Sequence, residues 1–319
     1  MRIRDWGRTA PRTRSVRAGI SIAFKISVAK QTPAFPSTIQ LPGMGQDSMN
    51  HASDLRPVAG FARMDLCFAV AALGLLATVA IPILANPAAG SRSLLCMDNL
   101  RRLTAAWTMY ADDQQGRLIL NRRDSEARSP LSGKSGWAMG EQDWSVSSAN
   151  TNTAFVTDDR YTELAAYTAR DPDLFWCPAD RYLSRSQIAL GWSHRVRSYA
   201  MNYFIGFTGS NYFPEYQPYN DLTDFRRLSP SRALLLIEEH PDSSNDPSFF
   251  FNMTKPEWYD YPASHHDGTS WVSFVDGHLE LRQWQSASTL QPVRLTYRYV
   301  GPAGEPDYSW LKERLSESR

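Results

Sequence analysis

The sequence lacks the short motifs that mark most enzyme and metal sites. It has no GxSxG nucleophile elbow, no Walker A loop and no GxGxxG turn, so the common hydrolase, phosphate-binding and dinucleotide-binding sites are not indicated. It also has no CxxC or HExxH spacing, which argues against zinc. No internal repeat or heptad array is visible, which excludes a solenoid and a long coiled coil. We therefore predict neither an enzyme nor a bound cofactor.

Excess charge of one sign is also lacking, because the net charge of the 319 residues is only +1. The charges are unevenly distributed: residues 1–60 hold nine Lys and Arg against three Asp, and residues 86–319 carry a net charge of −5. An acidic body repels phosphate backbones, so we predict no nucleic-acid partner. A basic start before an apolar run instead favours membrane insertion.

One long hydrophobic run is present, from Leu66 to Ala85, with the sequence LCFAVAALGLLATVAIPILA. At about 1.5 Å per residue such a run spans about 30 Å, the thickness of the apolar core of a bilayer. It predicts a transmembrane helix in the lipid bilayer, with the Arg-rich start in the cytoplasm and the C-terminal domain periplasmic or at the cell surface. The alternative is a secretory signal peptide that is cleaved near Ala85.

The residues before this run, Gly60-Phe61-Ala62-Arg63-Met64-Asp65, resemble the processing site of type IV prepilins and type II secretion pseudopilins. The resemblance implies that a prepilin peptidase cuts between Gly60 and Phe61 and that Phe61 is then methylated. Asp65 stands at the fifth mature position, where the family has an acidic residue that pairs with the amino terminus of a neighbouring subunit. The implied partners are the peptidase and other pilin-like subunits, which bind through the N-terminal helix.

Later blocks resemble the prepilin-type processing-associated H-X9-DG proteins. They are CMDNLRRL at residues 96–103 with WTMYADD at 107–113, FWCPAD at 175–180, RSYAMN at 197–202, and His266 followed after nine residues by Asp276-Gly277. Each block is short, and their order along the chain carries the resemblance. It implies a pilin-like fold.

We divide the chain into a disordered leader of residues 1–60, an N-terminal transmembrane and spine helix of residues 61–115, and an extracytoplasmic globular domain of residues 116–319. The leader shows no hydrophobic periodicity, and translation could start at Met44 or Met49 instead of Met1.

The body of the chain shows one helical face followed by strand-like runs. Apolar residues recur at steps of three to four residues, as in one face of a helix that ends near Gly116: Leu100, Leu103, Trp107 and Tyr110. Residues 232–238 predict a buried strand, and residues 270–276 and 277–284 flank an Asp-Gly step that predicts a hairpin. Residues 294–300 are a candidate edge strand. The expected fold is α+β, with the long membrane and spine helix packed on an antiparallel sheet.

Two of the three cysteines, Cys96 and Cys177, are expected in an oxidising outer compartment, where a disulfide persists. We predict that they form one, and the alternative is a pair of buried free thiols. The third, Cys67, lies inside the apolar run, where a thiol behaves as a small apolar group.

The residues His266, Asp276 and Gly277 form the best candidate for a functional site. Asp-Gly is turn chemistry, so we predict that His266 and Asp276 form a structural hydrogen bond. The alternatives are a metal site or an acid–base pair. Four acidic residues could supply oxygen ligands to Ca²⁺: Glu238, Glu239, Asp242 and Asp246.

Three functional hypotheses follow. The first is a membrane-anchored structural subunit of a secretion or pilus-like fibre, a single-pass protein of the inner membrane. The second is a membrane-tethered domain that binds extracellular glycans through some of the ten tryptophans. The third is a hydrolase that uses His266 and Asp276. We favour the first.

Overall fold

The computed structural model describes residues 87–319, apart from 124–125, 128–134, 209–210 and 298–300. All of these residues belong to one unit of the chain, residues 61–319. The predicted processing site at Gly60, Phe61 and Asp65 and the apolar run of residues 66–85 lie outside the described residues.

The longest described helix is α2, Pro87–Asp113. Proline suits the first position of a helix, because the N–H that it lacks would have no partner there. The predicted apolar face is buried: Leu100, Leu103, Trp107 and Tyr110 are at most 5% exposed. The helix stops where expected, because Gly116 takes a positive φ of 93° and its N–H donates to the carbonyl oxygen of Ala111 at 2.8 Å.

The prediction of a long membrane and spine helix over residues 61–115 is corrected by this structure. Within the part of the chain that the structure describes, no helix combines the length and apolar character needed to cross a membrane. Helix α2 carries charged side chains along its length, among them Arg92, Arg101 and Arg102, which suits a helix that packs on a domain. The transmembrane assignment and the single-pass inner-membrane location rested on the apolar run before Pro87 and are not retained.

The sheet has five strands in the order β3-β1-β2-β4-β5. Their bounds are β1 Tyr199–Asn202, β2 Leu234–Glu238, β3 Ser248–Phe249, β4 Thr269–Phe274 and β5 Leu279–Gln283. Strands β1, β2, β4 and β5 pair antiparallel in that order, but β3 pairs parallel with β1. The sheet is therefore mixed, and the prediction of an antiparallel sheet was wrong at this edge.

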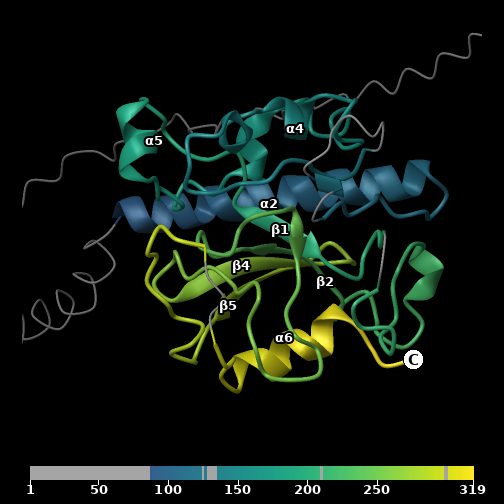
Figure 1. The fold of residues 1–319 in the computed structure, drawn as a ribbon. Coiled ribbons are helices and arrows are strands. Elements are labelled where there is room, and N and C mark those ends of the chain that lie inside the picture. The colour runs from purple at the N-terminus through teal and green to yellow at the C-terminus, as the bar shows by residue number, and fades with distance from the viewer. Residues whose placement is uncertain (1–86, 124–125, 128–134, 209–210, 298–300) are drawn as a thin grey trace, which may run out of the picture. The chain divides into compact units, whose positions relative to one another are not determined.

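Helices cover both faces of this sheet (Figure 1). Helix α2 packs against β4 and β2 on one face, and α6, Asp307–Leu315, packs against β2 on the other. Every residue of β2 is buried, as expected for a strand covered on both sides. The side chain of Asn202, on β1, links β2 to α6, because its amide donates to the carbonyl oxygens of Leu234 and Leu315 at 2.8 and 2.9 Å.

The segment between α2 and β1 forms a further layer on the side of α2 that faces away from the sheet (Figure 1). The helices described in this segment are short: η2 Ser148–Asn150, α4 Ala154–Thr157, η3 Pro172–Phe175 and α5 Arg185–Ala189. A further short helix, η4 Leu222–Asp224, lies between β1 and β2. Helix η3 packs directly on α2. The candidate edge strand at 294–300 is not formed in its described residues, 294–297.

Candidate functional site

The predicted disulfide between Cys96 and Cys177 is present in the structure. Cys96 lies on α2 and Cys177 follows η3, and both side chains are completely buried. Asn99, almost one turn beyond Cys96, reinforces the junction, because its amide donates to the carbonyl oxygens of Asp173 and Trp176, both at 2.9 Å. The bond therefore fixes the outer layer to the helix.

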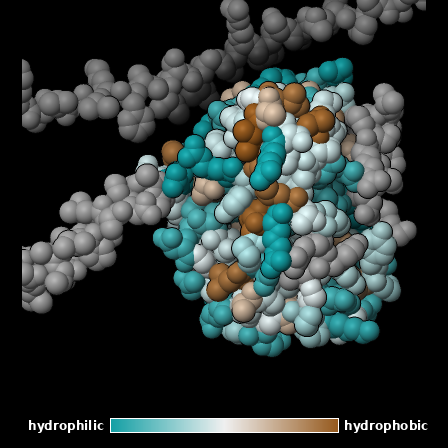
Figure 2. Space-filling view, turned by 60° about the vertical axis from the view of Figure 1, so that its left-hand side comes forward, coloured by the Kyte–Doolittle hydropathy of each residue, from teal (hydrophilic) through white to brown (hydrophobic). Residues whose placement is uncertain are grey.

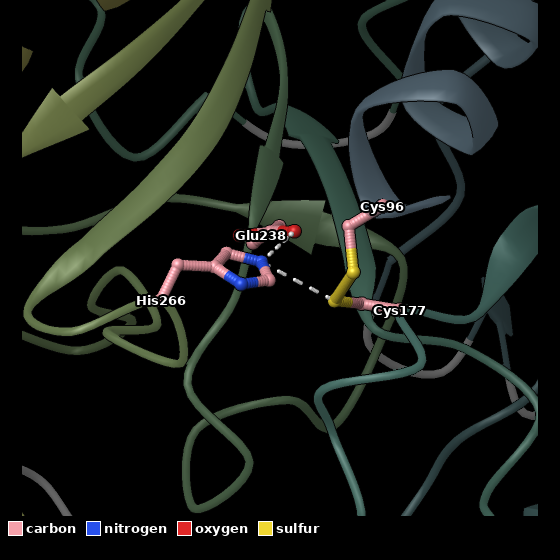
Figure 3. A group of neighbouring side chains, drawn as sticks. All are labelled: Cys96, Cys177, Glu238 and His266. Carbon is pink, nitrogen blue, oxygen red and sulfur yellow. Dashed lines mark hydrogen bonds and ion pairs between the residues drawn. A yellow bond between two sulfur atoms is a disulfide. The ribbon is translucent and has the colours of Figure 1, made fainter. Parts of the chain in front are cut away.

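His266 lies against this disulfide (Figure 3). Its Nε2 atom is 3.6 Å from Sγ of Cys177 and 3.1 Å from Oε1 of Glu238. A carboxylate can only accept, so the N–H on Nε2 donates to Glu238. The two side chains are 5% and 0% exposed, which makes this a buried, charge-assisted contact. We call Cys96, Cys177, Glu238 and His266 the disulfide cluster.

Glu238 is the residue that the sequence did not identify as the partner of His266. It is the last residue of β2, and its second oxygen, Oε2, accepts the backbone N–H of Trp271 on β4 at 3.0 Å. The indole N–H of Trp271 in turn donates to Oγ of Ser93 on α2 at 3.0 Å. The available signal was a carboxylate that ends a wholly apolar run, because such a group needs a donor inside the protein.

Parts of three of the sequence blocks, CMDNLRRL, FWCPAD and RSYAMN, meet at this cluster together with His266. Tyr199, from RSYAMN, donates its hydroxyl to the carbonyl oxygen of Cys96 at 3.1 Å. Burial raises the pKa of the Tyr199 phenol well above its ordinary value, so it remains a donor. Its neighbour Ser198 donates to Asp180 of FWCPAD at 2.8 Å. Residues far apart in the chain thus share one buried junction.

The predicted hydrogen bond between His266 and Asp276 is not formed. Strand β4, Thr269–Phe274, runs between them, and an extended strand separates its ends by about 3.3 Å per residue. Asp276 instead contacts His278, with Oδ1 2.6 Å from Nδ1 of that residue. The H-X9-DG spacing therefore joins two separate features, and the nine intervening residues contain the strand.

Asp276 and Gly277 form the turn of the β4–β5 hairpin, as the Asp-Gly step predicted. Gly277 has a φ of 95°, a value that side-chain-bearing residues rarely adopt, and its N–H donates to the carbonyl oxygen of Phe274 at 2.9 Å. The N–H of Phe274 donates back across the turn to His278 at 3.0 Å. This end of β4 is a surface turn, whereas the His266 end is buried.

The remaining Ca²⁺ candidates also carry hydrogen bonds from the protein. Asp242 accepts the backbone N–H groups of Arg294 and Thr296 at 2.6 and 3.1 Å. Oε1 of Glu239 accepts the hydroxyl of Ser243 at 3.1 Å, and burial raises the pKa of Glu239 to about 8. Oδ1 of Asp246 accepts the backbone N–H of Ser248 at 2.8 Å. The side chains of these three acidic residues therefore organise the loops after β2.

No known protein family, curated protein or solved structure matches this chain. The resemblance to pilin-like proteins therefore rests on the sequence blocks alone.

Proposed function

We propose that this chain is a pilin-like structural subunit that assembles with other pilin-like subunits and does not catalyse a reaction. The observation that carries the proposal is the disulfide cluster. Parts of the blocks by which the chain resembles the H-X9-DG proteins meet there: the disulfide and the hydroxyl of Tyr199 join α2 to the domain, and His266 contacts Glu238 at the end of β2. A subunit that transmits force or position through one helix needs that helix fixed to its body.

The same geometry argues against the hydrolase hypothesis. A catalytic histidine uses one ring nitrogen toward a nucleophile and the other toward an orienting group. In His266 a single nitrogen, Nε2, faces both Glu238 and the sulfur of Cys177, and that sulfur is in a disulfide. Asp276 lies at the other end of β4. Four of the tryptophans are fully buried and belong to the core instead of a glycan-binding surface: Trp107, Trp137, Trp258 and Trp284.

Exposed leucines at the start of α2 support assembly through this helix. Leu94 and Leu95 are 61% and 53% exposed, whereas Leu100 and Leu103 on the same helix are buried. Figure 2 brings forward the side on which the first turns of α2 and α5 lie, and hydrophobic patches interrupt the hydrophilic surface there. On α5, Ile188 is 60% exposed. The partner that covers these exposed apolar residues is another pilin-like subunit, as the pilin-like sequence blocks imply.

The test is processing followed by assembly. The full chain is produced together with a prepilin peptidase, its amino terminus is identified by mass spectrometry, and the product is examined by sedimentation and electron microscopy. We expect Phe61 as the first residue and large assemblies in the processed sample. Gly60→Val is the control and should remain uncut and unassembled.

Substitution of Leu95 by Glu should leave processing unchanged and reduce assembly, because it places a charge in an apolar contact. An intact leader in the wild type, together with a monomeric product, would overturn the proposal.

A further inference from the structure

The four side chains of the disulfide cluster offer four ligands for a transition metal once the bond between Cys96 and Cys177 is reduced. One ligand atom from each of Cys96, Cys177, Glu238 and His266 can be chosen so that all four lie within 4.8 Å of one another. Thiolate, imidazole and carboxylate are the ligand types that proteins offer to Zn²⁺. The four residues come from separate segments of the chain, so no compact sequence motif predicts the site.

The distances from Nε2 of His266 to the sulfur and to the carboxylate are close to those in a tetrahedral zinc site, and the two sulfur atoms, 2.10 Å apart in the disulfide, separate when the bond is reduced. With Zn–N and Zn–O bonds of about 2.1 Å and Zn–S bonds of about 2.3 Å, adjacent ligand atoms in a tetrahedron are about 3.4–3.8 Å apart. Nε2 of His266 is 3.6 Å from Sγ of Cys177 and 3.1 Å from Oε1 of Glu238. One ring nitrogen thus faces the sulfur and the carboxylate together (Figure 3), as a shared metal requires.

The surroundings orient these ligands as an outer shell does in metal sites. The carboxylate of Glu238 is held by the N–H of Trp271 on its second oxygen, so Oε1 stays directed at His266. Tyr199 holds the backbone of Cys96 through its carbonyl oxygen. The two cysteines and Glu238 are fully buried, which excludes water from the site.

We propose that the chain, when its disulfide is reduced, binds one Zn²⁺ through Cys96, Cys177, His266 and Glu238. A dithiol donates two electrons and two protons to the Cys96–Cys177 bond and is itself oxidised to a disulfide. Zn²⁺ then displaces the two thiol protons and takes the place of the hydrogen on Nε2 of His266, so that the neutral ring carries its N–H on Nδ1, because the thiolate and the unprotonated ring nitrogen are the forms that bind metal. In the reverse step a small-molecule disulfide accepts two electrons from the two thiolates, is itself reduced to two thiolates, and the re-formed Cys96–Cys177 bond releases the ion. This site goes beyond the structural role proposed above and does not depend on assembly.

The experiment uses the full chain, reduced and refolded with a trialkylphosphine, which converts the disulfide and one water into two thiols and a phosphine oxide. Co²⁺ is the probe, because four-coordinate Co²⁺ with thiolate ligands absorbs visible light and Zn²⁺ displaces it. We expect one Co²⁺ per reduced chain, with thiolate charge-transfer absorption, and none in the oxidised chain. Comparison of the two redox states of the wild type requires no variant.

Two variants and a matched control sharpen the result. His266→Gln and Glu238→Gln should each weaken Co²⁺ binding at least tenfold, because even residues outside the ligand shell change affinity by that amount. His278→Gln, on the exposed histidine at the other end of β4, should bind as the wild type does. Absence of thiolate absorption in the reduced chain, whether folded or not, would overturn the proposal. Equal binding by the oxidised chain or by His266→Gln would do the same.

Discussion

Strand β4 has a histidine–carboxylate contact beyond each end, and the two contacts differ mainly in burial. At one end Nε2 of His266 lies 3.1 Å from Glu238, with side chains that are 5% and 0% exposed. At the other end Nδ1 of His278 lies 2.6 Å from Asp276, with side chains that are 45% and 35% exposed. The shorter contact is in water and the longer one is in the core. If distance alone were considered, the exposed contact would be expected to contribute more to stability, and that order is wrong.

The buried contact contributes more to stability because burial increases the free energy lost when one partner is removed. An exposed carboxylate that loses its histidine is hydrated again, so little free energy is lost. The carboxylate of Glu238 would be left in the core with one donor fewer, and water does not reach it there. The His266 end of β4 therefore fixes the fold, whereas the Asp276 end only shapes a turn.

The largest effect is expected when the disulfide at the buried end is removed. The bond joins residues 81 positions apart, and a cross-link over such a loop stabilises the folded state by about 4 kcal/mol in the chain-entropy model. The double variant Cys96→Ala, Cys177→Ala should lose about that much free energy of unfolding in urea. A loss below about 1 kcal/mol would show that the bond does not restrain the domain.

A third histidine, His240, differs from His266 and His278 because its hydrogen-bonding partners are backbone groups and not a carboxylate. Its Nδ1 accepts the N–H of Asp242 at 3.1 Å, and its Nε2 donates to the carbonyl oxygen of Gln291 at 3.0 Å. Burial lowers the pKa of His240 to about 4. The unfolded chain, with an ordinary pKa of about 6.5, therefore binds the proton first as the pH falls.

The stability contributed by neutral His240 is thus present above pH about 6.5 and is lost toward pH about 4, by up to about 3 kcal/mol. Urea unfolding at a series of pH values measures it. The variant His240→Gln should show a smaller loss of stability over this range than the wild type. Parallel pH profiles for the two proteins would contradict the assignment.

Removal of the imidazole at the buried end should cost less than removal of the disulfide. His266→Ala deletes a charge-assisted hydrogen bond, so the free energy of unfolding should fall by about 1.5–3 kcal/mol. Thermal and urea unfolding of the oxidised protein measure the change. An unaltered midpoint would mean that Glu238 finds another donor.

The smallest effect is expected at the exposed end. His278→Ala should change the free energy of unfolding by no more than about 1 kcal/mol, because its contact with Asp276 is largely in water. The same unfolding measurement serves as the matched control for His266→Ala. Equal losses in the two variants would remove the distinction between the ends of β4.

The sequence predicted those parts of the fold that have a strong local pattern. The face of α2 followed from the spacing of Leu100 and Trp107, and the hairpin followed from the Asp-Gly step. Strand β3 has only two residues, too few for any periodicity, and its parallel pairing with β1 depends on tertiary contacts. Helix α6 was not predicted for a similar reason, since it is short and its burial depends on the sheet.

The candidate site was only half predictable. The pairing of Cys96 and Cys177 followed from the small number of cysteines and their expected compartment. The partner of His266 did not, because proximity in sequence suggested Asp276 and the register of β2 and β4 instead brings Glu238 to it. Sequence spacing does not show which end of a strand faces the core.

The most direct test is a pair of double-mutant cycles on His266, measured by urea unfolding of the oxidised protein. In the first cycle His266→Ala is combined with Glu238→Gln, and in the second with Asp276→Asn. We expect a coupling free energy of at least about 1 kcal/mol with Glu238 and additivity within about 0.5 kcal/mol with Asp276. Coupling to Asp276, with none to Glu238, would contradict the structural role assigned to the disulfide cluster.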